Sequence, residues 1–369
     1  MLKYLLFFII VLISNNLLAN CNFKSSDFFD ELNKPSSIEV IEVKINDYRS
    51  WVKEGLRILT STRSSILKEN KKNFKGNVRV KYEFGECIYK ARIRKMGDWK
   101  DHIDLLEGGK LLTSVDIHLY EGNILNAVDF KLLIPETRNG INEIIGSIIL
   151  KHLGFISPET FIIKGSINNT KSNFIFQEEA EKELIERNLR REGPIFEGDE
   201  SLLWDYENFE EFELEKIALS RLVNDNYSKK NKESTIVSLE SFLKIQNAYL
   251  EYVLQKTQNQ EHEIFLQPNS TFNSKIFLKY HLILFAMNGE HALRPHNRKF
   301  YYNIFIQDFE PIYYDGDLRL GEEYEREFIS KAELNYILLS LNEKDFDSLI
   351  ENLNFFLDND EIYETILAR

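Results

Sequence analysis

The pattern of apolar and polar positions divides the chain into a first part rich in strands and a second part rich in helices. Residues 37–45 (SIEVIEVKI) alternate as a half-buried strand does. Residues 77–84 and 87–94 also alternate, and the Gly-Glu pair between them predicts a hairpin. Residues 113–120 and 127–134 predict another strand pair. From about residue 180 onward, apolar residues recur at helical spacing instead.

The remaining elements follow from the same reading. The helix over 142–153 is expected to end at Gly154, because glycine is the common residue just past a helix C-terminus. We expect an α+β chain with a β-rich part over 20–179 and a mostly helical part over 180–369. The strands between 78 and 177 should form one antiparallel sheet with the 142–153 helix packed on it. Further predicted helices cover 48–59, 180–188, 208–224, 238–256, 275–287, 330–341 and 343–357, and further predicted strands cover 160–165, 173–177, 299–306 and 310–314.

The N-terminal segment has the pattern of a secretory signal. Residues 1–19 combine one lysine, an apolar run over 5–13, a polar break and a final alanine. A membrane anchor is the alternative, but the apolar run has about half the roughly 20 residues that a span needs. No other stretch is long and apolar enough to span a bilayer. We therefore expect an exported chain, periplasmic or extracellular, with a lipid on Cys21 as an open alternative.

Composition excludes several classes of protein. The chain has 59 acidic residues against 46 Lys and Arg, for a net charge of −13. A general nucleic-acid binder needs a concentrated basic face, so nucleic acid is not an expected partner. Its 2 cysteines, Cys21 and Cys87, exclude a disulfide scaffold and any zinc module built on cysteine.

The segment over 286–320 carries the densest candidate chemistry. A predicted helix ends in a polar loop that holds Glu290 and Asn297, and the strand pair after it leads to Asp315 and Asp317. An acid that orients an attacking hydroxyl, with an amide and acids that hold metal ions, is the set that magnesium-nucleotide chemistry requires.

Three other readings of this segment stay open. Asp315-Gly316-Asp317 has the composition of a plain turn. His291 and His296 are candidates for a transition-metal site, although no third ligand is evident. A hydrolase with paired acids is disfavoured, because Asp315 and Asp317 lie on one short turn and do not easily flank a bond from opposite sides.

The segment resembles the end of the spore-coat CotH kinase family, whose members are atypical protein kinases that bind ATP. Asn288-Gly289-Glu290 matches the catalytic loop, with Glu290 where the family has its catalytic Asp. Asn297 matches the metal-binding Asn, and residues 311–317 match the metal-binding end of the hairpin. The similarity runs from about Val78 to Leu320. It implies a bilobal, protein-kinase-like fold with an antiparallel β-rich N-terminal lobe and a helical C-terminal lobe.

Upstream segments supply the expected phosphate contacts. Lys131, mid-strand in an apolar run, is the candidate cation over the nucleotide phosphates, with Glu178 as its partner and Glu179 as the fallback. A solvent-facing role is the alternative for Lys131. Arg94 and Lys100, near a Gly turn that resembles one of the family, are further candidate phosphate contacts.

Two functions follow. The resemblance implies an exported kinase that uses ATP with Mg²⁺ or Mn²⁺ and transfers the γ-phosphate to a protein, glycan or other hydroxyl acceptor. In it, Glu290 would be catalytic, and Asn297, Asp315 and Asp317 would hold metal. The alternative is a catalytically inactive kinase-fold protein that binds a partner or assists assembly in the cell envelope.

Overall fold

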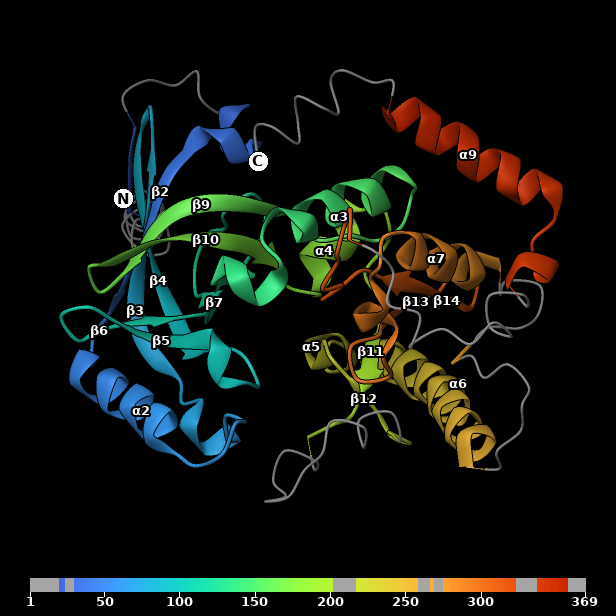
Figure 1. Cartoon of the computed structure of the whole chain (residues 1–369), viewed down its shortest axis with the longest axis horizontal. Helices are drawn as coiled ribbons and strands as arrows, with labels where there is room; N and C mark the ends of the chain where they lie inside the picture. Colours follow the sequence, from blue (N-terminus) through green and yellow to red (C-terminus); the bar gives the residue numbers. More distant parts are fainter. Residues whose placement is uncertain are drawn as a thin grey trace, which may run out of the picture. The chain divides into compact units, whose positions relative to one another are not determined.

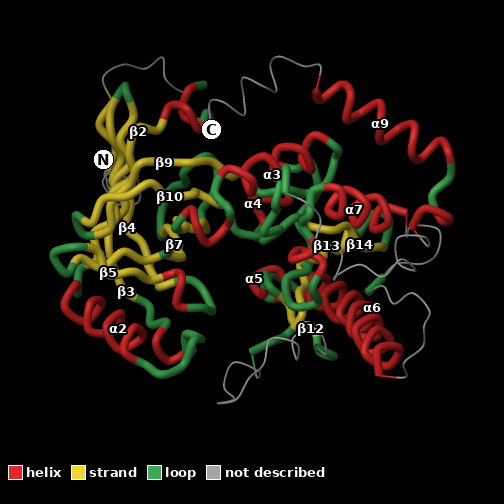
Figure 2. Tube along the Cα trace, in the orientation of Figure 1, coloured by secondary structure: helices red, strands yellow, loops and turns green. Residues whose placement is uncertain are grey.

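The computed structural model contains two compact units (Figures 1 and 2). The first unit has the described residues of Met1–Ile134 and Phe161–Gln177, and the second has those of Pro135–Thr160 and Glu178–Arg369. The expected boundary at 179/180 lies close to the point after Gln177 where the chain passes from the first unit to the second for the last time. The segment over 135–160, which was expected in the β-rich part, belongs to the second unit. The expected signal peptide lies outside the described residues, which are 20–23, 30–201, 217–257, 266–268, 275–322 and 337–357.

The first unit is built on one sheet. Its strand order is β1-β4-β3-β2-β9-β10-β8-β7, and β4 also pairs with β7. The seven strands from β4 round to β7 therefore form a closed barrel, which leaves no free edge among them. A separate hairpin joins β5 (Ile103–Leu106) to β6 (Lys110–Thr113). The strands of the large sheet are β1 (Asn20–Phe23), β2 (Ile38–Ile45), β3 (Phe74–Tyr82), β4 (Gly85–Lys95), β7 (Val115–Leu119), β8 (Asp129–Leu133), β9 (Thr160–Ile167) and β10 (Thr170–Glu178).

The expected single sheet is only partly correct. The strands predicted between 78 and 177 do share one sheet, and the β3–β4 hairpin turns where the Gly-Glu pair predicts it. The sheet is not purely antiparallel, because β2 and β9 pair in parallel with Ile41 opposite Gly165. The helix expected to pack on it, α3 (Ile141–His152), belongs to the second unit, where Leu150 joins an apolar cluster with Tyr280.

Strand alternation explains the core of the barrel. In β4, Cys87, Tyr89, Ala91 and Ile93 are buried, and the intervening residues are more exposed. The same period in β2 and β3 gives one continuous apolar core. Helix α2 (Tyr48–Thr60) adds Trp51, which is fully buried against that core.

One ion pair is buried between α2 and the end of β4. Lys95 Nζ lies 3.1 Å from Glu54 Oε1 and 3.6 Å from the centroid of the Trp51 ring, and Lys95 is fully buried. Burial lowers the pKa of Lys95 to about 8, although Glu54 favours its charged form. Removing one partner of such a pair leaves an uncompensated buried charge.

A disulfide ties the N-terminal strand to the barrel. Cys21 of β1 lies directly opposite Cys87 of β4, and the two are bonded. A cysteine that carries a thioether-linked lipid has no free sulfur for this bond. The disulfide and the lipid on Cys21 are therefore mutually exclusive.

The second unit contains a small four-stranded sheet of order β12-β11-β13-β14. Its apolar contacts form several separate clusters instead of one. Helix α3 ends as its sequence predicts, since Gly154 follows it with φ +84°. None of the described helices is both long enough and apolar enough to cross a membrane. The elements are β11 (Ile195–Gly198), β12 (Ser220–Leu222), β13 (Lys299–Asn303), β14 (Asp308–Ile312), α4 (Lys182–Arg187), α5 (Asp225–Ser228), α6 (Lys232–Thr257), α7 (Lys275–Ala286) and α9 (Glu343–Leu357).

The bilobal kinase-like fold is wrong. The first unit is a closed seven-stranded barrel with extra strands, and the second unit is not a helical lobe but contains its own four-stranded sheet. Part of the error is local: the helix predicted over 208–224 is wrong in its described part, 217–224, where Ser220–Leu222 form β12. The larger part is long-range, because alternation predicts strands but not which strand edges pair.

Candidate functional site

The second unit brings the predicted hairpin acid Asp315 into contact with a cation and a histidine. Asp315 follows β14 and is 9% exposed. Its Oδ1 lies 3.1 Å from Nε of Arg138, and its Oδ2 lies 3.8 Å from Nε2 of His291. Arg138 ends the 3-10 turn Pro135–Arg138, which precedes α3. We call Arg138, Glu143, His291, Asp315 and Asp317 the Asp315 cluster.

A buried acid fixes the loop that carries Asp315. Glu143, in the first turn of α3, is fully buried. Its Oε2 accepts a hydrogen bond from the Tyr313 hydroxyl at 2.7 Å and from the Gly316 N–H at 3.3 Å. Burial, with the nearby Glu143 charge, raises the pKa of Tyr313 well above its ordinary value, so the phenol remains a donor.

Asp317 is also held by neighbours. Its Oδ1 accepts a hydrogen bond from Asn139 Nδ2 at 2.8 Å, and Arg319 lies 3.8 Å from its Oδ2. Burial raises the pKa of the Asp317 carboxyl, an effect that His291 opposes. Burial likewise lowers the pKa of His291, an effect that Asp315 opposes. The cluster thus places three carboxyl groups, those of Glu143, Asp315 and Asp317, near the Arg138 guanidinium and the His291 imidazole.

The backbone is strained where these residues meet. Asn139, Asn288, Asp315 and Asp317 all have positive φ, at 50°, 53°, 51° and 46°. Asn and Asp tolerate this left-handed region better than other residues with a Cβ. Non-glycine residues in this conformation persist only where the surroundings impose it, and they concentrate at functional sites.

The polar loop after α7 contributes Glu290 and Asn297. Asn297 is 9% exposed, and its Nδ2 donates to the His291 carbonyl at 3.2 Å. Asn297 and Asp315 therefore both contact His291. Glu290 opens the 3-10 turn Glu290–Leu293, and its Oε1 is buried with no hydrogen bond to any described residue.

The donor set does not fit a divalent metal as it stands. The carboxylate expected to hold the ion faces the guanidinium of Arg138 instead. Within the described ranges, no three or more His, Cys, Asp or Glu side chains are grouped so that they could hold a metal. His291 and His296 contact each other edge to face, with ring centroids 6.1 Å apart.

The candidate phosphate contacts of the first unit have local partners. Arg94 is ion-paired with Asp116, which lies opposite it on β7, and Asp116 lies opposite Lys131 on β8. The three therefore form a row across β4, β7 and β8 on one face of the sheet. Lys131 is 5% exposed and points away from the barrel core, because its neighbours Phe130 and Leu132 fill that core. Lys100 Nζ donates to the Ser61 carbonyl at 2.6 Å.

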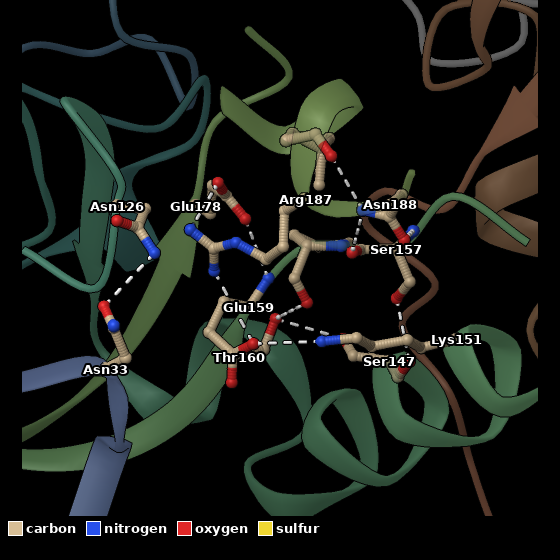
Figure 3. A network of polar contacts seen from close by, with 12 residues as sticks. Asn33, Asn126, Ser147, Lys151, Ser157, Glu159, Thr160, Glu178, Arg187 and Asn188 are labelled. Carbon is tan, nitrogen blue, oxygen red and sulfur yellow. Dashed lines mark hydrogen bonds and ion pairs between the residues drawn. The ribbon is translucent and has the colours of Figure 1, made fainter. Parts of the chain in front are cut away.

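Glu178 belongs to a second buried network, shown in Figure 3. Its Oε1 lies 3.0 Å from Arg187 Nη2 of α4, and its Oε2 accepts from the Glu159 N–H at 3.2 Å. Glu159 is shared between Arg187 at 3.6 Å and Lys151 at 3.2 Å. Burial raises the pKa of Glu178 to about 7, although Arg187 opposes the shift. The partner of Glu178 is therefore Arg187, and Glu179 is the less buried of the two acids.

Sequence reasoning missed Arg138, Glu143 and Arg187. Arg138 lies 177 residues before Asp315, in a stretch that has the composition of a polar turn, so no local pattern pairs them. Glu143 has a signal in the sequence, because an acid within an otherwise apolar helix face is unusual.

Searches with this sequence find no matching family model and no matching curated protein. The resemblance to the CotH kinases therefore rests on the motifs themselves.

Proposed function

We propose that this chain is an exported protein that binds a partner in the cell envelope and transfers no phosphoryl group. The observation that carries the proposal is the ion pair between Asp315 and Arg138. Arginine stays protonated at any physiological pH, so a divalent cation at Asp315 would lie beside a fixed positive charge and would have to displace it. On this account the strained loop around Asp315 has a structural role and is held by Arg138 and Glu143.

Two features support export. The leader pattern over 1–19 is typical of a secretory signal. The Cys21–Cys87 disulfide is the kind of bond that persists in oxidising compartments.

The test is transfer of the terminal phosphate from labelled ATP. The purified chain, with its disulfide intact, is incubated with ATP, Mg²⁺ or Mn²⁺, and an envelope extract. We expect no labelled acceptor above the level of an Asp315→Asn variant. Labelling that needs wild-type Asp315 would overturn the proposal.

Phosphoryl transfer is the second candidate, because one observation favours it. Glu290, matched to a catalytic acid, has a buried oxygen without a hydrogen bond, as a base awaiting an acceptor hydroxyl would. On that account Glu290→Gln lowers turnover by about 10²–10⁴-fold and spares nucleotide binding, whereas Asp315→Ala abolishes both.

A further inference from the structure

A second feature of the same unit lies apart from the Asp315 cluster. A cavity of about 430 Å³ is bounded by α4, the segment after it, α5, the first turns of α6 and the β13–β14 turn. This volume is in the range of small-molecule pockets. A pocket of this size can hold a small ligand such as a dipeptide or tripeptide.

Several polar groups that line the cavity are already paired. Lys230 is ion-paired with Glu192. Asn231 Oδ1 accepts from both the N–H and the hydroxyl of Ser234, which satisfies the start of α6. These contacts shape the wall and leave little capacity for a ligand.

Three lining groups can still form an ion pair or a hydrogen bond with a ligand. Among the described residues, neither the Arg191 guanidinium nor the Glu233 carboxylate has an ion-pair partner, and the Tyr227 hydroxyl makes no hydrogen bond. The Arg191 guanidinium lies over the Phe305 ring, with its Cζ 6.0 Å from the centroid. Burial and the Glu192 charge raise the pKa of Tyr227, which keeps its hydroxyl a donor.

The remaining lining residues are Glu186, which is paired with Lys182 at 3.7 Å on α4, and two apolar side chains. Val237 and Ile304 are half-buried and pack against an apolar cluster of this unit, and Tyr227 is 8% exposed. Within the described part of the chain, the cavity therefore offers the guanidinium of Arg191, the carboxylate of Glu233 and an apolar surface for a ligand. This combination suits a ligand with a carboxylate, an ammonium group and an apolar side chain.

We infer that this cavity binds a short peptide of two or three residues with both ends free. Arg191 takes the C-terminal carboxylate, for which its planar fork is suited, and Glu233 takes the N-terminal ammonium. The apolar side chain lies against Val237 and Ile304. The inference goes beyond the proposed function, since it does not depend on whether Asp315 holds a metal.

The experiment is calorimetric titration of the purified chain with alanyl-leucine, its N-acetylated form and its C-amidated form at pH 7. We expect the free dipeptide to bind, and each blocked form to bind about tenfold or more weakly, because each loses one charge-assisted contact.

Single variants assign the two ends. In Arg191→Gln, amidation should no longer weaken binding while acetylation still does, and Glu233→Gln should show the reverse. Glu240→Gln, an exposed acid further along α6 and outside the cavity lining, is the matched control and should bind all three peptides as the wild type does. The inference fails if the free dipeptide gives no saturable heat up to about 10 mM. It also fails if the blocked forms bind equally well, or if Glu240→Gln has the same effect as Glu233→Gln.

Discussion

The two units bury charge in different ways. The first has one continuous apolar core, and Lys95 with Glu54 is buried at its margin beneath Trp51. The second divides its apolar contacts into separate clusters, with buried acids and guanidinium groups in its interior. Asp315 with Arg138 and Glu178 with Arg187 are examples. A packed barrel stabilises a fold, whereas buried ionic networks cost desolvation and persist where they fix a conformation. The predicted catalytic and metal-binding residues all lie in the second unit, whereas the predicted phosphate contacts Arg94, Lys100 and Lys131 lie in the first.

The largest expected effect comes from breaking the buried ion pair of Lys95 and Glu54 in the first unit. Glu54→Leu leaves Lys95 buried and unpaired, which should lower the free energy of unfolding by about 3–5 kcal/mol. The double variant Glu54→Leu/Lys95→Met should recover most of the loss, because both charges are gone. Urea denaturation followed by tryptophan fluorescence reports this, since Trp51 packs on Lys95. A double variant as unstable as the single one would contradict this account of the pair.

Removing the disulfide should destabilise the first unit nearly as much. It joins residues 66 apart, so the chain-entropy model gives about 4 kcal/mol of stabilisation, and typical values are about 2–4. Cys21→Ser/Cys87→Ser should lose this amount by urea denaturation. The wild type should lose it on reduction, whereas the variant should not respond to the reductant. Equal stability of variant and wild type would show that β1 contributes little to the barrel.

The two units should respond to pH with opposite slopes. Glu178 has its pKa raised from 4.5 to about 7, so the folded state keeps a proton that the unfolded state has released between these values. The stability of the second unit should therefore fall as pH rises from 4.5 to 7, by up to about 3 kcal/mol. Hydrogen exchange read by peptide mass assigns the change to a unit. Glu178→Gln should flatten the profile, and a profile unchanged in that variant would contradict the assignment.

Lys95 should make the stability of the first unit change with pH in the opposite direction. Its pKa is lowered from 10.5 to about 8, so above pH 8 the unfolded state holds a proton that the folded state has lost. Stability of the first unit should rise between pH 8 and 10, by about 2 kcal/mol. Lys95→Met in the Glu54→Leu background should lack this rise. A fall over the same range in the wild type would contradict the shift.

The smallest expected effect is the difference in stability between variants of two arginines of the second unit. Arg138→Gln removes the partner of a buried carboxylate and should cost about 1–3 kcal/mol. Arg319→Gln, in an exposed pair with Asp317, should change stability by less than about 0.5 kcal/mol. Thermal denaturation of the two variants gives the comparison. Equal losses would mean that burial of Asp315 is not what makes Arg138 important.

What the sequence could predict was local. Alternation predicted the β3–β4 hairpin, two short β runs predicted β13 and β14, and Gly154 predicted the end of α3, because each depends on neighbouring residues. Closure of the barrel depends on β4 meeting β7, a pairing that no short pattern encodes. The candidate site divides in the same way. The sequence predicted the polar loop and the hairpin acid, but Arg138, which is paired with Asp315, comes from a distant segment.

The central claim is that Arg138 already neutralises Asp315, so the chain does not bind a metal nucleotide. Calorimetric titration of the wild-type chain with ATP and Mn²⁺ at pH 7 tests it most directly. We predict no saturable binding up to about 1 mM nucleotide, in the wild type as in Asp315→Ala. Saturable binding that requires Mn²⁺ and is lost in Asp315→Ala would contradict the claim and favour phosphoryl transfer.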